Sequence, residues 1–163
     1  MRIQRDFYLN KLFSKRHNGM IKVITGMRRC GKSYLLFNIF GAWLRKNGYD
    51  RRHVVSVQLD DDDAANLRTP RALSAWVKSR LPKDGGRCVV MIDEIQMCKP
   101  PADAPSGDVT FYDVLNSLRK KKGISVYVTG SNSEMLSKDV ATNFRDRGIE
   151  IRVWPLSFSE LLQ

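Results

Sequence analysis

Residues 26–33, with the sequence GMRRCGKS, match the spacing G-x-x-x-x-G-K-[ST] of a phosphate-binding loop. Such a loop wraps a β-phosphate with backbone N–H groups, and Gly26 and Gly31 allow the backbone to turn and to approach the ligand closely. We expect Lys32 to bridge β- and γ-phosphate oxygens and the Ser33 hydroxyl to hold Mg2+. Backbone amides matter more than side chains at the variable positions Arg28, Arg29 and Cys30, and Tyr34 is a further position expected to contact the nucleotide.

Two adjacent carboxylates follow an apolar run further along the chain. The run that starts at Cys88 ends in Asp93 and Glu94. At the end of a strand beside the phosphate loop, Asp93 would deliver a carboxylate to the Mg2+ shell, and Glu94 would polarise an attacking water as a general base. The competing interpretation, a pair of surface charges, is less favoured because a phosphate loop lies in the same chain.

A third apolar run, 124–129, ends in Gly130-Ser131-Asn132-Ser133. Ser131 and Asn132 are therefore candidates for a group that senses the γ-phosphate or holds the attacking water. Ser131 also has a structural interpretation, because Ser131-Asn-Ser-Glu134 has the spacing of a helix capping box. The sequence leaves both interpretations open.

These residues need a scaffold that brings the ends of several strands together. Short β-branched runs predict strands at 21–25, 54–58, 88–93, 124–129 and 149–153. Helical spacing predicts helices at 33–46, 71–81, 111–121 and roughly 134–144, with a short helix at 5–13 packed on the sheet edge. This alternation predicts a three-layer α/β domain in which a mainly parallel, five-stranded sheet is covered on both faces.

Turn and cap residues support these boundaries. Thr69 offers a capping hydroxyl before Pro70, and Gly48 lies where the preceding helix would end in a C-terminal cap with a left-handed backbone conformation. The segment Ser157-Phe-Ser-Glu160 reads as a second capping box. The stretch 99–108, with its prolines and glycine, is expected to be a flexible surface loop.

Bulk composition indicates one domain. A chain of 163 residues with 42% hydrophobic content can bury one core, and no apolar run is long enough for a membrane span. The N-terminus lacks the apolar centre of a signal peptide, and three cysteines without zinc spacing favour reduced thiols. We expect a cytoplasmic protein with no membrane partner.

The net charge of +11 is unevenly distributed along the sequence. Residues 1–59 hold 13 Lys/Arg and 2 Asp/Glu, whereas residues 60–163 hold 15 of each. A basic surface of this kind attracts nucleic acid, acidic protein or a polyphosphate ligand, although a solvated basic face explains the charge as well as a nucleic-acid surface does.

The motifs discriminate among classes of phosphate-loop protein. A GTPase would carry an Asn-Lys-x-Asp base reader and an Asp-x-x-Gly switch, and neither is present. A small-molecule kinase would also carry the loop, but paired acids such as Asp93 and Glu94, followed by a strand that ends in polar residues, are less typical of that class. Hydrolysis of the nucleotide is therefore favoured over transfer of phosphate to an acceptor.

Four segments in this order, IKVITGMRRCGKSYLL, VVMIDEIQ, VYVTGSNSEML and ATNFRDRGIEIRVWPLSFSELL, resemble the prokaryotic AAA-type ATPases that carry a C-terminal, nuclease-like domain of unknown function. The resemblance spans nearly the whole chain. It implies an AAA-type core over residues 1–163, with an N-terminal helical segment at 1–20 and strands that carry both Walker motifs and the sensor. Because family members continue well beyond PLSFSELL, it also implies an N-terminal ATPase domain without its helical lid and partner domain.

The resemblance further implies an arginine finger at Arg147, with Arg145 as the rival, reaching the γ-phosphate of a neighbouring subunit and so requiring self-association. The leading hypothesis is an ATP-binding, Mg2+-dependent ATPase. The alternatives are a nucleotide-gated module that binds DNA or protein through residues 1–59 with little hydrolysis, and a small-molecule kinase.

Overall fold

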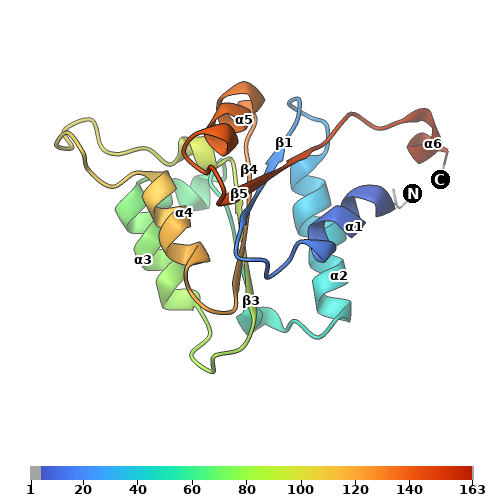
Figure 1. Ribbon diagram of the computed structural model, residues 1–163, viewed down its shortest axis with the longest axis horizontal. Coiled ribbons are helices and arrows are strands. Elements are labelled where there is room, and N and C mark those ends of the chain that lie inside the picture. Colours follow the sequence, from blue (N-terminus) through green and yellow to red (C-terminus); the bar gives the residue numbers. More distant parts are fainter. Residues whose placement is uncertain (1–4, 163) are drawn as a thin grey trace.

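A computed structural model describes residues 5–162 as a three-layer α/β domain (Figure 1). All pairings among the five described strands are parallel, and the order across the sheet is β2-β3-β4-β1-β5. The strands are β1 (Ile21–Thr25), β2 (Val54–Gln58), β3 (Cys88–Asp93), β4 (Ile124–Thr129) and β5 (Gly148–Arg152). The predicted α/β class and five-stranded sheet are confirmed.

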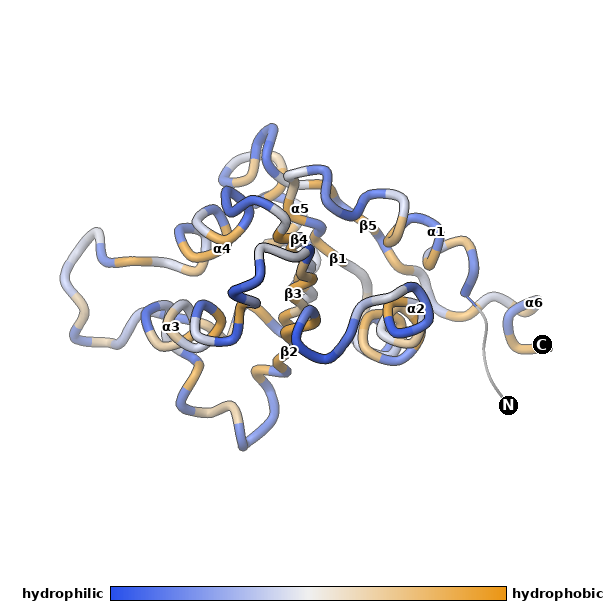
Figure 2. The backbone as a smooth tube through the Cα atoms, turned by 90° about the horizontal axis from the view of Figure 1, so that it is seen from below, coloured by the Kyte–Doolittle hydropathy of each residue, from blue (hydrophilic) through white to orange (hydrophobic). Residues whose placement is uncertain are grey.

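Helices cover both faces of the sheet, as Figures 1 and 2 show from two directions. One face is covered by α3 (Pro70–Arg80), α4 (Phe111–Arg119) and α5 (Ser133–Ala141). The other face is covered by α1 (Asp6–Ser14), the π-helical segment η1 (Tyr34–Phe40) and α2 (Gly41–Lys46), which continues from η1. Short helical turns are η2 (Arg51–His53), η3 (Asp62–Leu67), η4 (Ile95–Met97) and α6 (Phe158–Leu161).

The core has one cluster on each side of the sheet because successive strand residues point to opposite faces. Val23 on β1 belongs to the cluster under α3 and α4, whereas its neighbour Ile24 belongs to the cluster under α1 and η1. The central strands β1, β3 and β4 are buried along their whole length, which is why each of them is a continuous apolar run in the sequence.

The helix at 5–13 forms, but its expected position on the sheet edge is wrong. It packs beside η1 over the face of the sheet, where Leu12 is fully buried and its carbonyl accepts a hydrogen bond from the Tyr127 hydroxyl at 2.6 Å. The apolar stripe of this helix is buried more completely against a sheet face than it would be at an edge.

Two cap predictions also need correction. Thr69 precedes Pro70 at the start of α3 but makes no side-chain capping bond. The expected box from Ser131 to Glu134 does not form, because the Asn132 side chain caps α5 by accepting from the Met135 amide at 3.2 Å.

The capping box between Ser157 and Glu160 forms, and Gly48 has the expected left-handed backbone with φ of 87°. Helix α5 ends at Ala141, before the expected 144, where the Thr142 hydroxyl donates to the Lys138 carbonyl at 2.8 Å. Residues 99–108 contain no helix or strand. Among the described residues, no helix is both long enough and apolar enough to cross a membrane.

The parallel topology collects the carboxyl ends of the strands at one edge of the sheet. The register pairs Ile24 with Thr129 and Ile92 with Val128, so the segments after β1, β3 and β4 leave the sheet side by side. In Figure 1 the connection after β1 stands at the top of the molecule, whereas the turns that lead into β2, β3 and β4 lie at the bottom.

Candidate nucleotide-binding site

The loop between β1 and η1 depends on glycine at its first position. Gly26 has φ of 145°, and a Cβ there would meet the Val153 carbonyl oxygen and lie 2.9 Å from the Cys30 sulfur. Gly31 and Arg29 also have left-handed backbones, with φ of 89° and 66°. The chain therefore turns sharply at the apex of the loop, and the exposed Arg29 adopts a backbone conformation that side-chain-bearing residues rarely take.

Lys32 closes the loop on itself. Its side chain is buried, and Nζ donates to the Gly26 carbonyl at 2.9 Å and to the Met27 carbonyl at 2.8 Å. An ammonium group with two carbonyl partners lies inside the turn that the motif predicts for a phosphate. Cys30 is also buried and its thiol faces the Val153 carbonyl, so only its backbone can serve a ligand.

Two side chains from distant parts of the chain fix this loop from outside. The Ser133 hydroxyl donates to the Gly26 carbonyl at 2.7 Å and accepts from the Gly26 amide at 2.9 Å. Arg5 donates to the Cys30 carbonyl at 2.9 Å and to the Trp154 carbonyl at 2.6 Å. Arg5 also forms a 3.0 Å ion pair with Glu160, so the loop is tied to both ends of the described chain.

Asp93 lies at the end of β3, buried, and accepts a hydrogen bond from the Thr129 hydroxyl. Burial raises the pKa of the Asp93 carboxyl, and the nearby charges of Glu94 and Asp60 raise it further. The hydroxyls of Thr129 and Ser33 oppose this shift by stabilising the charged form. Ser33 of the loop and Asp93 of the adjacent motif are thus neighbours, as the sequence predicts.

Glu94 turns away from the strand with a left-handed backbone, φ 55° and ψ 49°. Its amide donates to the Thr129 hydroxyl at 3.3 Å. Its carboxylate accepts from the Ser131 hydroxyl at 2.9 Å and from the Gln96 amide group. Ser131 therefore joins the site, whereas the side chain of Asn132 is occupied as a helix cap.

Sequence reasoning missed four residues that shape the site: Thr129, Gln96, Ser133 and Arg5. Thr129 and Ser133 flank the predicted sensor segment, and a polar residue at the end of a buried apolar run is a signal that identifies the first. Gln96 and Arg5 carry no local signal, because their partners lie on other elements.

Arg145 and Arg147 are not brought to this site. Both are exposed, and they precede β5, whose first residue Gly148 pairs with Ile21 at the start of β1. The phosphate loop follows Thr25 at the other end of the same strand. Arg147 therefore lies at the opposite edge of the sheet from the loop of its own chain.

A cavity of about 240 Å³ adjoins the loop apex. Most of its exposed surface is apolar, and its lining comprises Arg5, Arg29, Cys30, Gly31, Tyr34, Pro155 and Leu156. The Tyr34 ring is 45% exposed, so an aromatic face is available directly beyond the phosphate motif.

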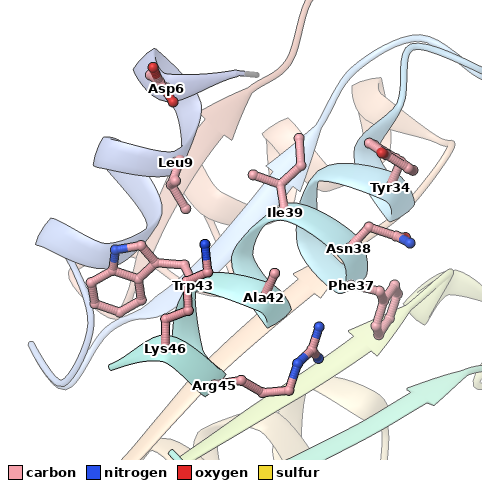
Figure 3. A pocket seen from close by; sticks show the side chains of 10 residues that line it. All are labelled: Asp6, Leu9, Tyr34, Phe37, Asn38, Ile39, Ala42, Trp43, Arg45 and Lys46. Carbon is pink, nitrogen blue, oxygen red and sulfur yellow. The ribbon is translucent and has the colours of Figure 1, made fainter. Parts of the chain in front are cut away.

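A larger cavity of about 650 Å³ lies between α1 and the η1–α2 helix (Figure 3). Figure 3 shows Asp6 and Leu9 of α1 on one side, and Tyr34, Trp43 and Arg45 among the side chains of the facing helix. Asp6 is the one carboxylate among the described residues that line it, and these do not include a residue of the phosphate loop, Asp93 or Glu94. The chemistry of the chain is therefore concentrated at the smaller cavity and the strand ends.

Comparison with known proteins identifies relatives of this arrangement. A family model described as an AAA domain matches residues 18–162. An uncharacterized protein of Haemophilus influenzae is 28% identical over 98% of this chain, which spans 37% of that protein. An uncharacterized protein of Methanocaldococcus jannaschii is 29% identical over 99% of this chain, which spans 31% of that protein. The chain thus spans about a third of the length of these curated relatives.

Solved structures share the fold at low sequence identity. The Aeropyrum pernix ORC2 protein, solved as ADPNP–ADP complexes, superposes with a TM-score of 0.57 and 16% identity over 99% of this chain and 50% of that one. Caenorhabditis elegans PCH-2 gives a TM-score of 0.55 and 16% identity over 91% of this chain and 40% of that one. Saccharomyces cerevisiae RIF2 gives a TM-score of 0.57 and 17% identity over 98% of this chain and 60% of that one. These likenesses identify the fold as that of the AAA+ phosphate-loop ATPases.

Proposed function

Because this chain belongs to the AAA domain family, we propose that it binds ATP with Mg2+ at the phosphate loop and hydrolyses it. The family gives it a nucleotide-binding fold of the ATPase type. The observation that carries hydrolysis, as distinct from binding alone, is the Glu94 carboxylate beside the buried Asp93, at the edge where the loop begins.

The loop binds the triphosphate through its backbone amides between Gly26 and Ser33, aided by the positive N-terminal end of the following helix. Lys32 leaves the two loop carbonyls that it contacts and donates to β- and γ-phosphate oxygens instead. Arg28 and Arg29 are exposed at the apex and contribute mainly backbone amides.

The nucleobase takes the apolar cavity beside the loop. The exposed ring of Tyr34 offers a stacking face, and Pro155 and Leu156 form an apolar wall. A phosphate chain anchored at Gly31 ends close enough to this cavity for the base to enter it.

The Ser33 hydroxyl and the Asp93 carboxylate hold the Mg2+. Both are oxygen donors of the kind that this ion prefers, and within residues 5–162 Asp93 has no ion-pair partner that competes with a cation. No cluster of three acidic, histidine or cysteine ligands exists among the described residues, so phosphates and water complete the shell. Bound Mg2+ neutralises the charge that develops on the phosphates.

Glu94 acts as the general base toward the attacking water. Ser131 and Gln96 hold its carboxylate in one orientation, so the base is positioned before the nucleotide binds. Ser131 is also the better candidate for sensing the γ-phosphate, because Asn132 would have to release the α5 amide first. Arg147 completes the site only from a second subunit, since its own loop lies at the other edge of the sheet.

Two substitutions test the proposal, with nucleotide affinity and phosphate release measured separately. Lys32→Ala should lose ATP affinity. Glu94→Gln should bind ATP as wild type does but lose hydrolysis by about 10²-fold or more. Glu134→Gln is the matched control, because Glu134 is exposed on α5 and within residues 5–162 pairs only with Lys138. Hydrolysis at the wild-type rate in Glu94→Gln would refute the base, and wild-type affinity in Lys32→Ala would refute the phosphate site.

A further inference from the structure

The net charge of the chain gathers at the edge of the sheet opposite the phosphate loop. The four connections that lead into β1, β2, β3 and β4, the last taken together with the final residue of α4, are residues 15–20, 47–53, 81–87 and 119–123, and we refer to them together as the basic edge. They hold ten lysine or arginine residues and two aspartates, so eight of the chain's eleven net positive charges lie there. The basic excess is thus a feature of one edge of the fold rather than of the N-terminal third.

The opposite edge has the reverse character beside the nucleotide site. The connections that follow β2 and β3, residues 59–69 and 94–110, hold seven acidic residues and two basic ones. These two connections repel a polyanion, whereas the basic edge attracts one. Figure 2 views the molecule from below, where the largely hydrophilic turns that lead into the strands surround the hydrophobic sheet.

The basic edge contains a pocket of about 320 Å³. It is assembled from three of the four connections, and its lining comprises Arg16, Asn47, Gly48, Tyr49, His53 and Arg87. The guanidinium of Arg16 lies over the Trp43 ring and donates through Nη1 to the Phe13 carbonyl at 2.8 Å. Its Nε is buried and has no acceptor within the described part of the chain.

The two acidic residues of this edge do not neutralise the pocket. Asp50 pairs with Arg52 and His53, and Asp84 pairs with His53. Neither forms an ion pair with Arg16 or Arg87 within residues 5–162. The pocket therefore presents two guanidinium groups without a carboxylate partner, and a phosphate group is an anion that accepts hydrogen bonds from both.

We propose that the basic edge binds the sugar–phosphate backbone of duplex nucleic acid, with one phosphate seated between Arg16 and Arg87. An acidic protein fits less well, because a stable protein interface buries apolar and aromatic anchors at its centre. Within the described residues, the large exposed apolar side chains lie outside the basic edge, at Phe7, Met27, Tyr34, Trp154, Phe158, Leu161 and Leu162.

The size of the surface gives the number of phosphates. Four adjacent strands in a sheet span about 14 Å, and phosphates along one strand of a duplex recur about every 3.4 Å, so about four of them face the basic edge. Neutralising four phosphates makes the logarithm of the association constant fall with the logarithm of salt concentration with a slope of about −4.

The test uses a fluorescently labelled DNA duplex of about 30 base pairs and arbitrary sequence. Its binding to the protein is measured over a range of salt concentrations. Lys120→Glu with Lys121→Glu removes two exposed cations from the basic edge. The expected result is at least about tenfold weaker binding and a slope reduced to about −2. The matched control is Lys99→Glu with Lys138→Glu, which has the same net charge but alters sites outside the basic edge. Arg87→Ala tests the pocket and should also weaken binding.

The control variant should bind as wild type does to within about threefold, and all variants should keep the ATP affinity of wild type because the phosphate loop is at the other edge. Three results would overturn the proposal: no binding of the duplex by wild type at low salt, equal weakening in the edge and control variants, or displacement of the duplex by polyglutamate at equal charge concentration. The last result would assign the surface to an acidic protein. A failure of ATP hydrolysis would leave this measurement unaffected, since it requires no nucleotide.

Discussion

Lys22 is a cation buried in the interior of β1, and replacing it should change how stability depends on pH. Its side chain is fully buried, and Nζ donates to the Ser125 hydroxyl at 2.9 Å and to the side-chain amide oxygen (Oδ1) of Asn18 at 3.4 Å. Nζ also lies over the face of Tyr127, 4.9 Å from the ring centroid. Neutral partners compensate a buried charge only partly, so burial lowers the pKa of Lys22 from 10.5 to about 8.

The sign follows from proton binding in the two states. Between pH 8 and 10.5 the unfolded chain keeps the Lys22 proton while the folded chain releases it, so stability rises with pH across this window. Over the whole window, lowering the pKa from 10.5 to about 8 changes the free energy of unfolding by about 3 kcal/mol. From about pH 7 to about pH 10, wild type should therefore gain about 2.5 kcal/mol of unfolding free energy relative to Lys22→Met, which lacks the titrating group.

Urea unfolding of both proteins at several pH values measures this difference directly, because the other titrating groups are common to both. Lys46→Met, which removes an exposed lysine of α2, is the control and should follow wild type at every pH. If the curves of wild type and Lys22→Met run parallel from neutral to alkaline pH, Lys22 is not held as a buried cation.

Three further substitutions probe the nucleotide site. Gly26→Ala forces a methyl group against the Val153 carbonyl at a left-handed φ of 145°. This substitution should abolish ATP affinity and lower the free energy of unfolding by about 1–3 kcal/mol. Wild-type ATP affinity in this variant would contradict the loop geometry. Gln96→Ala removes one of the two side-chain donors to the Glu94 carboxylate. We expect kcat to fall several-fold with KM unchanged, and the pH profile of kcat to shift. A purely structural role of Gln96 would instead lower stability and leave the pH profile in place. Arg147→Ala should lose hydrolysis but regain part of it when mixed with a variant of the phosphate-loop lysine, since each protein supplies what the other lacks; no recovery at any mixing ratio would exclude a contribution between subunits.

The strands could be predicted closely because short β-branched runs, and burial on both faces for the three central strands, leave a strong local signal. The runs 21–25, 54–58, 88–93 and 124–129 match β1 to β4 residue for residue. Strands β1, β3 and β4 are buried along their whole length and are therefore continuous apolar runs, whereas β2 is an edge strand that was recognised from its valines. The last strand begins one residue earlier than predicted, at Gly148, because pairing with β1 rather than side-chain type fixes where an edge strand starts.

The site was predictable where a motif is contiguous and not where it is assembled by tertiary structure. Ser33 and Asp93 lie together as their motifs predict. The contacts that hold the loop depend on Arg5 and Ser133, whose partners are 25 and 107 residues away in the chain. Capping failed as a guide at Ser131 because a nearby carboxylate competes for its hydroxyl, which leaves Asn132 to cap the helix.

Parallel topology also offers a simpler reason for cations at the basic edge, and it accounts for only part of them. Each helix that leads into a strand ends at this edge, and a cation in its last turn is stabilised by the helix dipole by about 0.3–1 kcal/mol. Arg119 is such a residue, in the last turn of α4. The effect fades beyond that turn, yet Lys121 and Lys122 lie beyond the helix cap and Arg87 follows an extended segment. Charges of one sign that no dipole and no carboxylate compensates lower the stability of the isolated domain, and the polyanion proposed above would compensate them.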